Sequence, residues 1–184
     1  MPAKEWPTRV IITDGTYTAE VDSLGYLVAI EVEHHKVHEG DFYTASDYDN
    51  NVLVAAPKYW LIRTPANLRF HTKINIESDT GCLLEFFENP TINVNGVVLT
   101  AFNNDRNSAK TSIVQFYGDP TVGADGTRIQ VARVGAGREK KLGGVARLAA
   151  EWILKENEEY LVKVTVDANG ANVTMNAEGY EIPT

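Results

Sequence analysis

Four Asn-Gly or Asp-Gly dipeptides constrain the fold of this chain more than any other feature. They are Asp14-Gly15, Asn95-Gly96, Asp125-Gly126 and Asn169-Gly170. Each lies between short segments rich in Val, Ile, Thr and aromatic residues. Such dipeptides tolerate the positive φ angles of a type I′ turn, which joins two adjacent antiparallel strands. The pattern therefore predicts four two-residue hairpins and a mainly antiparallel sheet.

The most apolar part of the chain lies between residues 69 and 117. It contains four runs separated by Gly, Asn, Asp and Pro, each too short for an ordinary helix: Arg69–Glu77, Cys82–Glu88, Val97–Phe102 and Thr111–Tyr117. We expect these runs to form strands of the core. No repeat of fixed period is evident, which argues against a propeller or solenoid. The sequence predicts an all-β fold, an antiparallel β-sandwich of jelly-roll type.

Two further parts of the chain, its N-terminus and residues 147–154, are predicted from weaker signals. Pro2 and Pro7 disfavour helix, so we expect residues 1–9 to form an extended N-terminal arm and residues 10–184 a single β-sandwich domain. Residues 147–154 fit either the apolar stripe of a helix or a strand of a hairpin. The alternation in the run that follows favours the strand.

Composition limits the classes of partner. The chain of 184 residues carries 17 Lys and Arg against 25 Asp and Glu, a net charge of −8, which argues against nucleic-acid binding. No apolar run approaches the ~20 residues of a membrane span. No signal-peptide pattern precedes the domain, so we expect synthesis in a cytoplasm. The single cysteine, Cys82, lies in an apolar run and is expected to be a buried, inert thiol.

The densest polar cluster contains three of the four histidines, His34, His35 and His38. In a strand, His34 and His35 would point to opposite faces. On a helix, His34 and His38 would share a face, but Gly40 and the β-branched flanking residues argue against a long helix, so we expect no metal site there. The alternation of Asn103, Asp105 and Asn107 matches the first ligands of a calcium loop, but Gly and Glu are missing at the later ligand positions. A turn rich in Asn and Asp explains it better.

Enzymatic motifs are not found. The chain lacks the Gly-x-Ser-x-Gly, P-loop and Gly-x-Gly-x-x-Gly patterns. We therefore expect a non-enzymatic protein without a cofactor.

Three segments together resemble tailed-bacteriophage virion structural proteins, specifically capsid decoration (cement) proteins. They are residues 33–41, residues 102–108, and residues 151–157 followed by Tyr160-Leu161. The likeness runs in order from about Glu31 to the end of the chain. Asp105 stands where such a protein would have another Asn.

This resemblance implies a β-sandwich or jelly-roll module on the outer surface of a virion capsid, made in the host cytoplasm. The implied partner is the major capsid protein, and the implied assembly is a homotrimer; neither nucleic acid nor membrane is expected as a partner. One set of residues is expected at subunit or capsid contacts: Trp6, His34, His35, His38, Asn103, Asn104, Asp105, Arg106 and Asn107.

The alternative is a carbohydrate-binding or receptor-binding module of a phage tail. Aromatic side chains exposed in one groove would support it. The candidates in the sequence are Tyr43, Tyr48, Tyr59 and Trp60.

Overall fold

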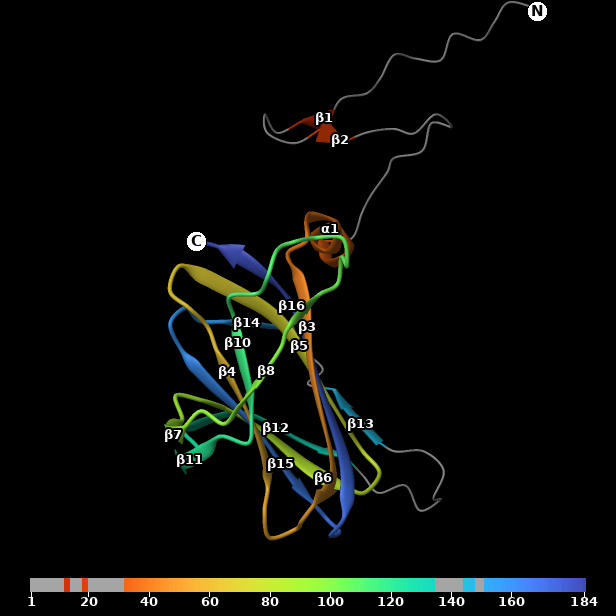
Figure 1. The fold of residues 1–184 in the computed structure, drawn as a ribbon, viewed down its shortest axis with the longest axis vertical. Helices are drawn as coiled ribbons and strands as arrows, with labels where there is room; N and C mark the ends of the chain where they lie inside the picture. Colours follow the sequence, from red (N-terminus) through yellow and green to blue (C-terminus); the bar gives the residue numbers. More distant parts are fainter. Residues whose placement is uncertain (1–11, 14–17, 20–31, 135–143, 148–150) are drawn as a thin grey trace, which may run out of the picture.

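A computed structural model describes residues 12–13, 18–19, 32–134, 144–147 and 151–184. This part of the chain is built almost wholly from antiparallel strands, with one helix, α1 (Val32–Glu39) (Figure 1). No helix within these ranges is both long and apolar enough to cross a membrane. The predicted all-β antiparallel sandwich is confirmed, whereas its jelly-roll connectivity stays a prediction. The arm at residues 1–9 lies outside the described residues.

Two six-stranded sheets pack against each other. The first has the spatial order β12 (Thr127–Val134), β6 (Cys82–Glu88), β15 (Glu159–Val166), β4 (Lys58–Arg63), β10 (Gln115–Gly118) and β8 (Val97–Leu99). The second has the order β13 (Gly144–Arg147), β5 (Leu68–Ser78), β16 (Ala171–Pro183), β3 (Phe42–Val52) and β9 (Phe102–Asn103), and β14 (Trp152–Leu154) also pairs with β5. Two small sheets pair β7 (Thr91–Val94) with β11 (Thr121–Ala124), and β1 (Ile12–Thr13) with β2 (Thr18–Ala19).

A single apolar core fills the space between the two large sheets. Side chains along β5 alternate between buried and more exposed positions, as expected for a strand with one face on the core. Trp60, Phe70 and Phe86 are completely buried and come from both sheets. Cys82 is also completely buried, and burial raises the pKa of its thiol. The expectation of a buried thiol is confirmed.

The predicted hairpins are wrong in their pairing. The strands on either side of Gly96, Gly126 and Gly170 do not pair with each other, because each of these glycines takes the chain from one sheet into another. All three glycines adopt positive φ, so the local turn chemistry is as expected. Around Asp14-Gly15 the strands do pair, but Thr13 is opposite Thr18, and four residues rather than two lie between them.

The run 111–117 is a strand only from Gln115 onward, and Val97–Phe102 divides between β8 and β9. The ambiguous segment 147–154 ends in a strand, β14, which pairs with β5 and not with the run that follows it. Residues 148–150 lie outside the described residues.

An internal two-fold relation organises the first sheet. The segment 86–99 recurs in the sequence as 116–129. Four residues are identical in the two copies: Phe86, Pro90, Thr91 and Gly96 recur as Phe116, Pro120, Thr121 and Gly126. Each copy supplies a strand of the large sheet, a strand of the small sheet and an edge strand, as β6-β7-β8 and β10-β11-β12. The duplication occurs only once, so a search for an array of repeats overlooks it.

The strand register extends this relation across the whole sheet. At the centre, β4 and β15 pair with Leu61 opposite Leu161. Phe87 of β6 is opposite Leu161, and its counterpart Tyr117 of β10 is opposite Leu61. On their outer sides, Phe87 pairs with β12 and Tyr117 pairs with β8. The edge strands β12 and β8 therefore occupy equivalent positions in a two-fold arrangement.

The histidine cluster lies on a helix and not on a strand, so the predicted strand there is wrong. The helix α1 ends at Gly40, which adopts a φ of 72°. The N–H of Gly40 donates to Val37 O and that of Asp41 donates to Lys36 O, which is the Schellman arrangement. Gly40, which in the sequence argues against a long helix, is the C-terminal cap of this short one.

Candidate functional site

The Asn- and Asp-rich loop after β9 is fixed by its own side chains. Asn103 is buried, and its amide nitrogen donates to Gly40 O at 2.8 Å and to Lys110 O at 3.2 Å. Its side-chain oxygen accepts from the N–H of Asp105, whose carboxylate accepts from the N–H of Asn107. These bonds confirm a turn stabilised by Asn and Asp side chains. Asn103 is therefore ill placed as a direct contact residue, contrary to the expectation.

Asn104 and Arg106 are two exposed members of this loop, close to β9 in the chain. The side chain of Asn104 accepts a hydrogen bond from Thr44 at 2.9 Å. The guanidinium of Arg106 lies 5.3 Å from the ring centroid of Phe102, within the range of a cation–π contact. Asn107 is also exposed, whereas Asp105 is half-buried.

The three helix histidines do not act as one group. His34 and His38 lie one turn apart with their Nε2 atoms 3.0 Å from each other. His35 instead lies 3.1 Å from a carboxylate oxygen of Glu39. Within the described residues, no three or more His, Cys, Asp or Glu side chains are grouped as metal ligands would be. Trp6, the remaining expected contact residue, lies outside the described residues.

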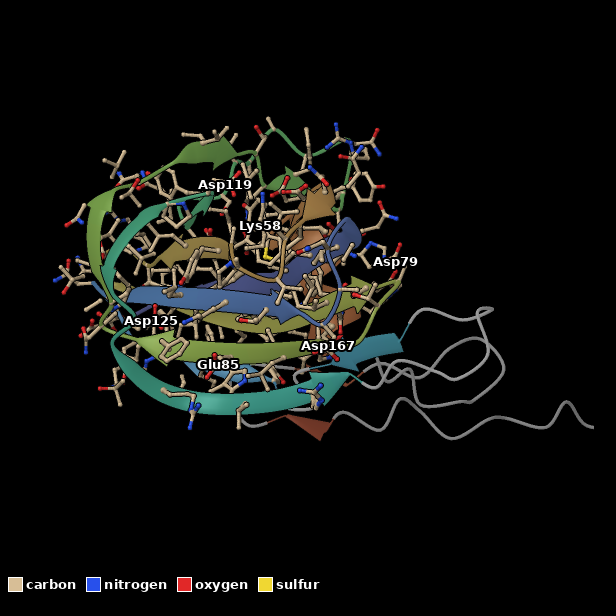
Figure 2. The ribbon with its side chains drawn as sticks, turned by 90° about the horizontal axis from the view of Figure 1, so that it is seen from below. Lys58, Asp79, Glu85, Asp119, Asp125 and Asp167 are labelled. Atoms are coloured by element: carbon tan, nitrogen blue, oxygen red, sulfur yellow. The ribbon has the colours of Figure 1, made fainter. Side chains whose placement is uncertain are left out.

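Lys58 of β4 is buried and lies beside Asp119 (Figure 2). Through Asp47 and Asp49 of β3, this lysine links the two large sheets. Its ammonium lies 2.8 Å from an oxygen of Asp119, 3.3 Å from Asp49 and 3.5 Å from Asp47. Burial alone would lower the pKa of Lys58, but the three carboxylates outweigh it, so its pKa is raised. The amine therefore remains charged and is unsuited to act as a nucleophile. A pocket of about 230 Å³ opens beside it, and its lining includes Leu53 and Pro57.

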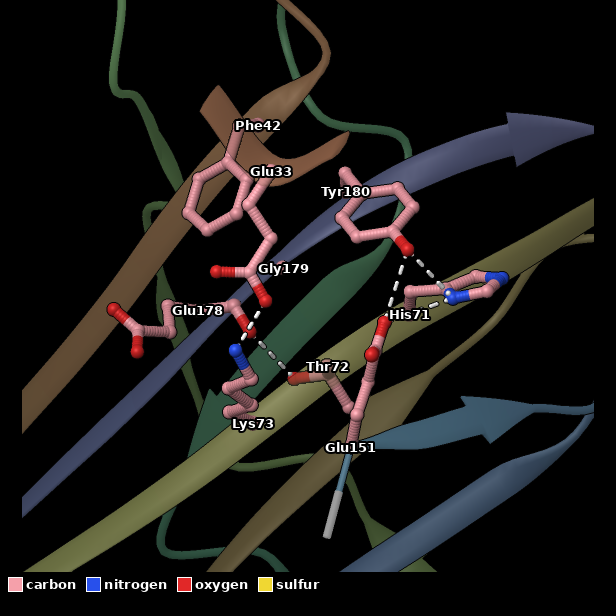
Figure 3. Close-up of a pocket in the computed structure, with 9 residues that line it drawn as sticks. All are labelled: Glu33, Phe42, His71, Thr72, Lys73, Glu151, Glu178, Gly179 and Tyr180. Atoms are coloured by element: carbon pink, nitrogen blue, oxygen red, sulfur yellow. Dashed lines mark hydrogen bonds and ion pairs between the residues drawn. The ribbon is translucent and has the colours of Figure 1, made fainter. Parts of the chain in front are cut away.

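A second polar group lies over the second sheet, where a hydroxyl, an imidazole and a carboxylate meet (Figure 3). Tyr180 donates to Glu151 at 3.0 Å, and His71 Nδ1 lies 2.9 Å from both of these side chains. Burial and the neighbouring Glu151 raise the pKa of Tyr180 to about 12. The adjoining cavity has about 10 Å³, which is room for one water molecule at most. Tyr180 of β16 and His71 of β5 are thus joined through Glu151.

The strongest candidate for a contact surface is a set of exposed apolar side chains on β8 and on the strands before and after it in the chain. It consists of Val94, Val97, Val98 and Phe102, which are 59%, 65%, 69% and 57% exposed. All four lie within nine residues of the chain: Val94 on β7, Val97 and Val98 on β8, and Phe102 on β9. We call these four residues the β8 stripe. Single exposed apolar residues are ordinary, but four of them within nine residues of the chain make this segment a candidate contact surface.

The equivalent edge strand, β12, provides an internal comparison. Thr127 and Arg128 occupy the positions of Val97 and Val98. Arg128 is paired with the carboxylate of Glu85 at 2.7 Å. Charged residues on an edge strand prevent unwanted association. The β12 edge thus carries a charged residue that disfavours association, whereas the equivalent β8 edge carries two exposed valines.

Two of the four aromatic residues proposed for sugar binding belong to the interior. Trp60 is completely buried and donates from Nε1 to Asp47 at 2.7 Å. Tyr43 is also buried, and its hydroxyl donates to Gly40 O. Tyr48 is exposed, and it donates to the side chain of Asn172. The four do not form one exposed groove.

Sequence reasoning missed the β8 stripe because each valine, taken alone, reads as part of a core strand. The duplicated segment was the signal that could have found it, since it places Val97-Val98 against Thr127-Arg128. Comparison with known proteins adds no further guide: no family model, curated protein or solved structure matches this chain.

Proposed function

We propose that this chain is a virion structural protein that binds the outer surface of a phage capsid and stabilises the shell. The proposal follows from the resemblance of residues 33–41, 102–108 and 151–161 to capsid decoration proteins. The single structural observation that supports it is the β8 stripe. The loop 103–107 begins at the end of this stripe, and Arg106 lies against Phe102.

The stripe is the right kind of surface for a weak contact made many times. Four partly exposed apolar side chains amount to a few hundred Å² at most, on the order of the patches that mark interaction sites. A stable pairwise interface needs roughly 800 Å² from each partner. We therefore propose that attachment relies on several copies acting together, as in a homotrimer on the major capsid protein.

Stabilisation requires that the protein prefer the assembled shell. A ligand with equal affinity for assembled and separated subunits shifts no equilibrium. The contact must therefore depend on two or more capsid subunits lying side by side. Binding then stabilises the shell by mass action.

The test uses capsids stripped of this protein and a variant copied from the equivalent edge. The double substitution Val97→Thr with Val98→Arg installs the residues that the β12 edge already carries, so the fold should be retained. We expect the wild type to bind capsids and raise the temperature at which they rupture, and the variant to bind at least tenfold more weakly. The matched control is Ile153→Thr on β14, where the side chain is 57% exposed.

Two results would defeat the proposal. One is capsid binding by the double variant that equals that of the wild type and the Ile153→Thr control. The other is failure of the wild type to bind capsids, with localisation to the tail and binding to host glycans. Light scattering that shows a monomer, both free and with capsids, would contradict the proposed homotrimer.

A further inference from the structure

The helix α1 brings two exposed imidazoles to one point. His34 and His38 are separated by one helical turn, and their ring centroids lie 4.6 Å apart. Residues at this spacing share one face of a helix. Their Nε2 atoms are 3.0 Å apart, and both side chains are exposed to solvent. The expectation of no metal site assumed a strand, and the helix removes its geometric basis.

We propose that His34 and His38 form a two-histidine chelate for a divalent late transition-metal ion, Cu²⁺ or Ni²⁺. Imidazole nitrogens bind such ions at about 2.0–2.1 Å. Two nitrogens 3.0 Å apart can both reach an ion at that distance, with an angle at the metal of about 94°. This value fits two adjacent positions of a square-planar or octahedral ion, whereas tetrahedral Zn²⁺ prefers a wider angle of about 109°.

The helix is held in place at both ends, so the chelate needs little ordering on binding. Near its start, Glu33 forms an ion pair with Lys73 of β5. At its end, the Schellman cap is joined by a hydrogen bond from the Tyr43 hydroxyl to Gly40 O at 3.2 Å. Since no third protein ligand is grouped with the pair among the described residues, water would fill the other coordination positions. Affinity then follows the Irving–Williams order, with Cu²⁺ the tightest.

The chain offers a matched control in His35. It lies between the two proposed ligands in sequence, is exposed, and is directed at Glu39 rather than at the pair. Replacing His35 with Gln removes one imidazole from the same helix without touching the chelate. Replacing His34 or His38 with Gln removes one of its two ligands.

The experiment is calorimetric titration of the full chain with CuCl₂ and with NiCl₂ after removal of metal with a chelator. We expect one ion per chain, Cu²⁺ bound more tightly than Ni²⁺ and Ni²⁺ more tightly than Zn²⁺. His34→Gln and His38→Gln should each weaken binding at least tenfold, and His35→Gln should leave it unchanged. Circular dichroism of each variant verifies that the fold is retained.

The proposal is overturned if His34→Gln and His38→Gln bind Cu²⁺ as tightly as the wild type. It is equally overturned if His35→Gln weakens binding as much as they do, or if the wild type binds no ion. The result is independent of capsid attachment, because the titration is made on the free chain without capsids.

Discussion

Gly96 and Gly126 are expected to be the least replaceable surface residues in this protein. They occupy equivalent turns, with φ angles of 87° and 90°. A Cβ on Gly96 would lie 2.1 Å from the carbonyl oxygen of Gly118, and a Cβ on Gly126 would lie 2.4 Å from that of Glu88. Each turn therefore presses against the backbone at the end of a strand in the other copy of the duplicated segment.

Gly170 allows the effect of positive φ on stability to be separated from the effect of a clash with the backbone. Its φ is also positive, at 76°, but the nearest atom to an added Cβ is 4.0 Å away. Gly170→Ala should therefore lose only the conformational term, about 1–2 kcal/mol. Gly96→Ala and Gly126→Ala add a backbone clash that forces the strands apart, which costs about 1–3 kcal/mol more. We expect losses in the free energy of unfolding of roughly 2–5 kcal/mol for each of these two variants.

Urea denaturation followed by tryptophan fluorescence measures these losses. We expect Gly96→Ala and Gly126→Ala to be similar in stability and both clearly less stable than Gly170→Ala. If Gly96→Ala lowers the free energy of unfolding no more than Gly170→Ala does, the close approach of the Gly96 turn to the backbone of Gly118 is wrong. If Gly96→Ala and Gly126→Ala differ widely, the two-fold equivalence of the turns is wrong.

Two further predictions concern the polar groups that join the strands. Replacing Lys58 with Ala leaves its three aspartate partners without a buried cation, so we expect a loss of about 3–5 kcal/mol in urea unfolding; a loss below 1 kcal/mol would contradict this account. Burial alone would raise the pKa of Glu151, but hydrogen bonds from His71 and Tyr180 outweigh it, so the pKa is lowered. A carboxyl whose pKa is lower in the folded state stabilises the protein above its ordinary value near 4.5, and this stabilisation is lost as the pH falls through the folded value. Glu151→Gln should therefore flatten the fall in stability below pH ~4.5 in acid titrations, and an unchanged acid profile would contradict it.

The strands were predictable because their signal is local. A short apolar run bounded by turn residues defines Cys82–Glu88 with the same limits in sequence and structure. Strand partners were not predictable in this way. The positive φ of Gly96 or Gly170 determines how the backbone turns, but not which sheet the next strand joins. That choice depends on contacts between segments far apart in the chain.

The helix was missed for a different reason. α1 buries none of its side chains, so it carries no apolar stripe of helical period. Its stability comes from polar terms, such as Glu33 in the first turn, Lys36 and His38 in the last, and the Gly40 cap. Asn103 shows the converse error, since a polar loop residue was assumed to be exposed and is instead buried among backbone hydrogen-bond partners.

The duplicated sheet separates residues needed by the fold from residues free to serve a contact. Positions that the architecture requires are alike in both copies, as with Pro90 and Pro120, which are both buried. Positions 97–98 and 127–128 occupy equivalent places on edge strands, but one pair is Val-Val and the other Thr-Arg. The position in the sheet therefore does not by itself explain the exposed valines. We propose that a difference of environment does: the β8 edge would meet a partner, whereas Arg128 on the β12 edge is paired with Glu85. The double substitution that makes the β8 edge resemble the β12 edge therefore tests contact and fold separately, because its new residues are already tolerated at the equivalent site.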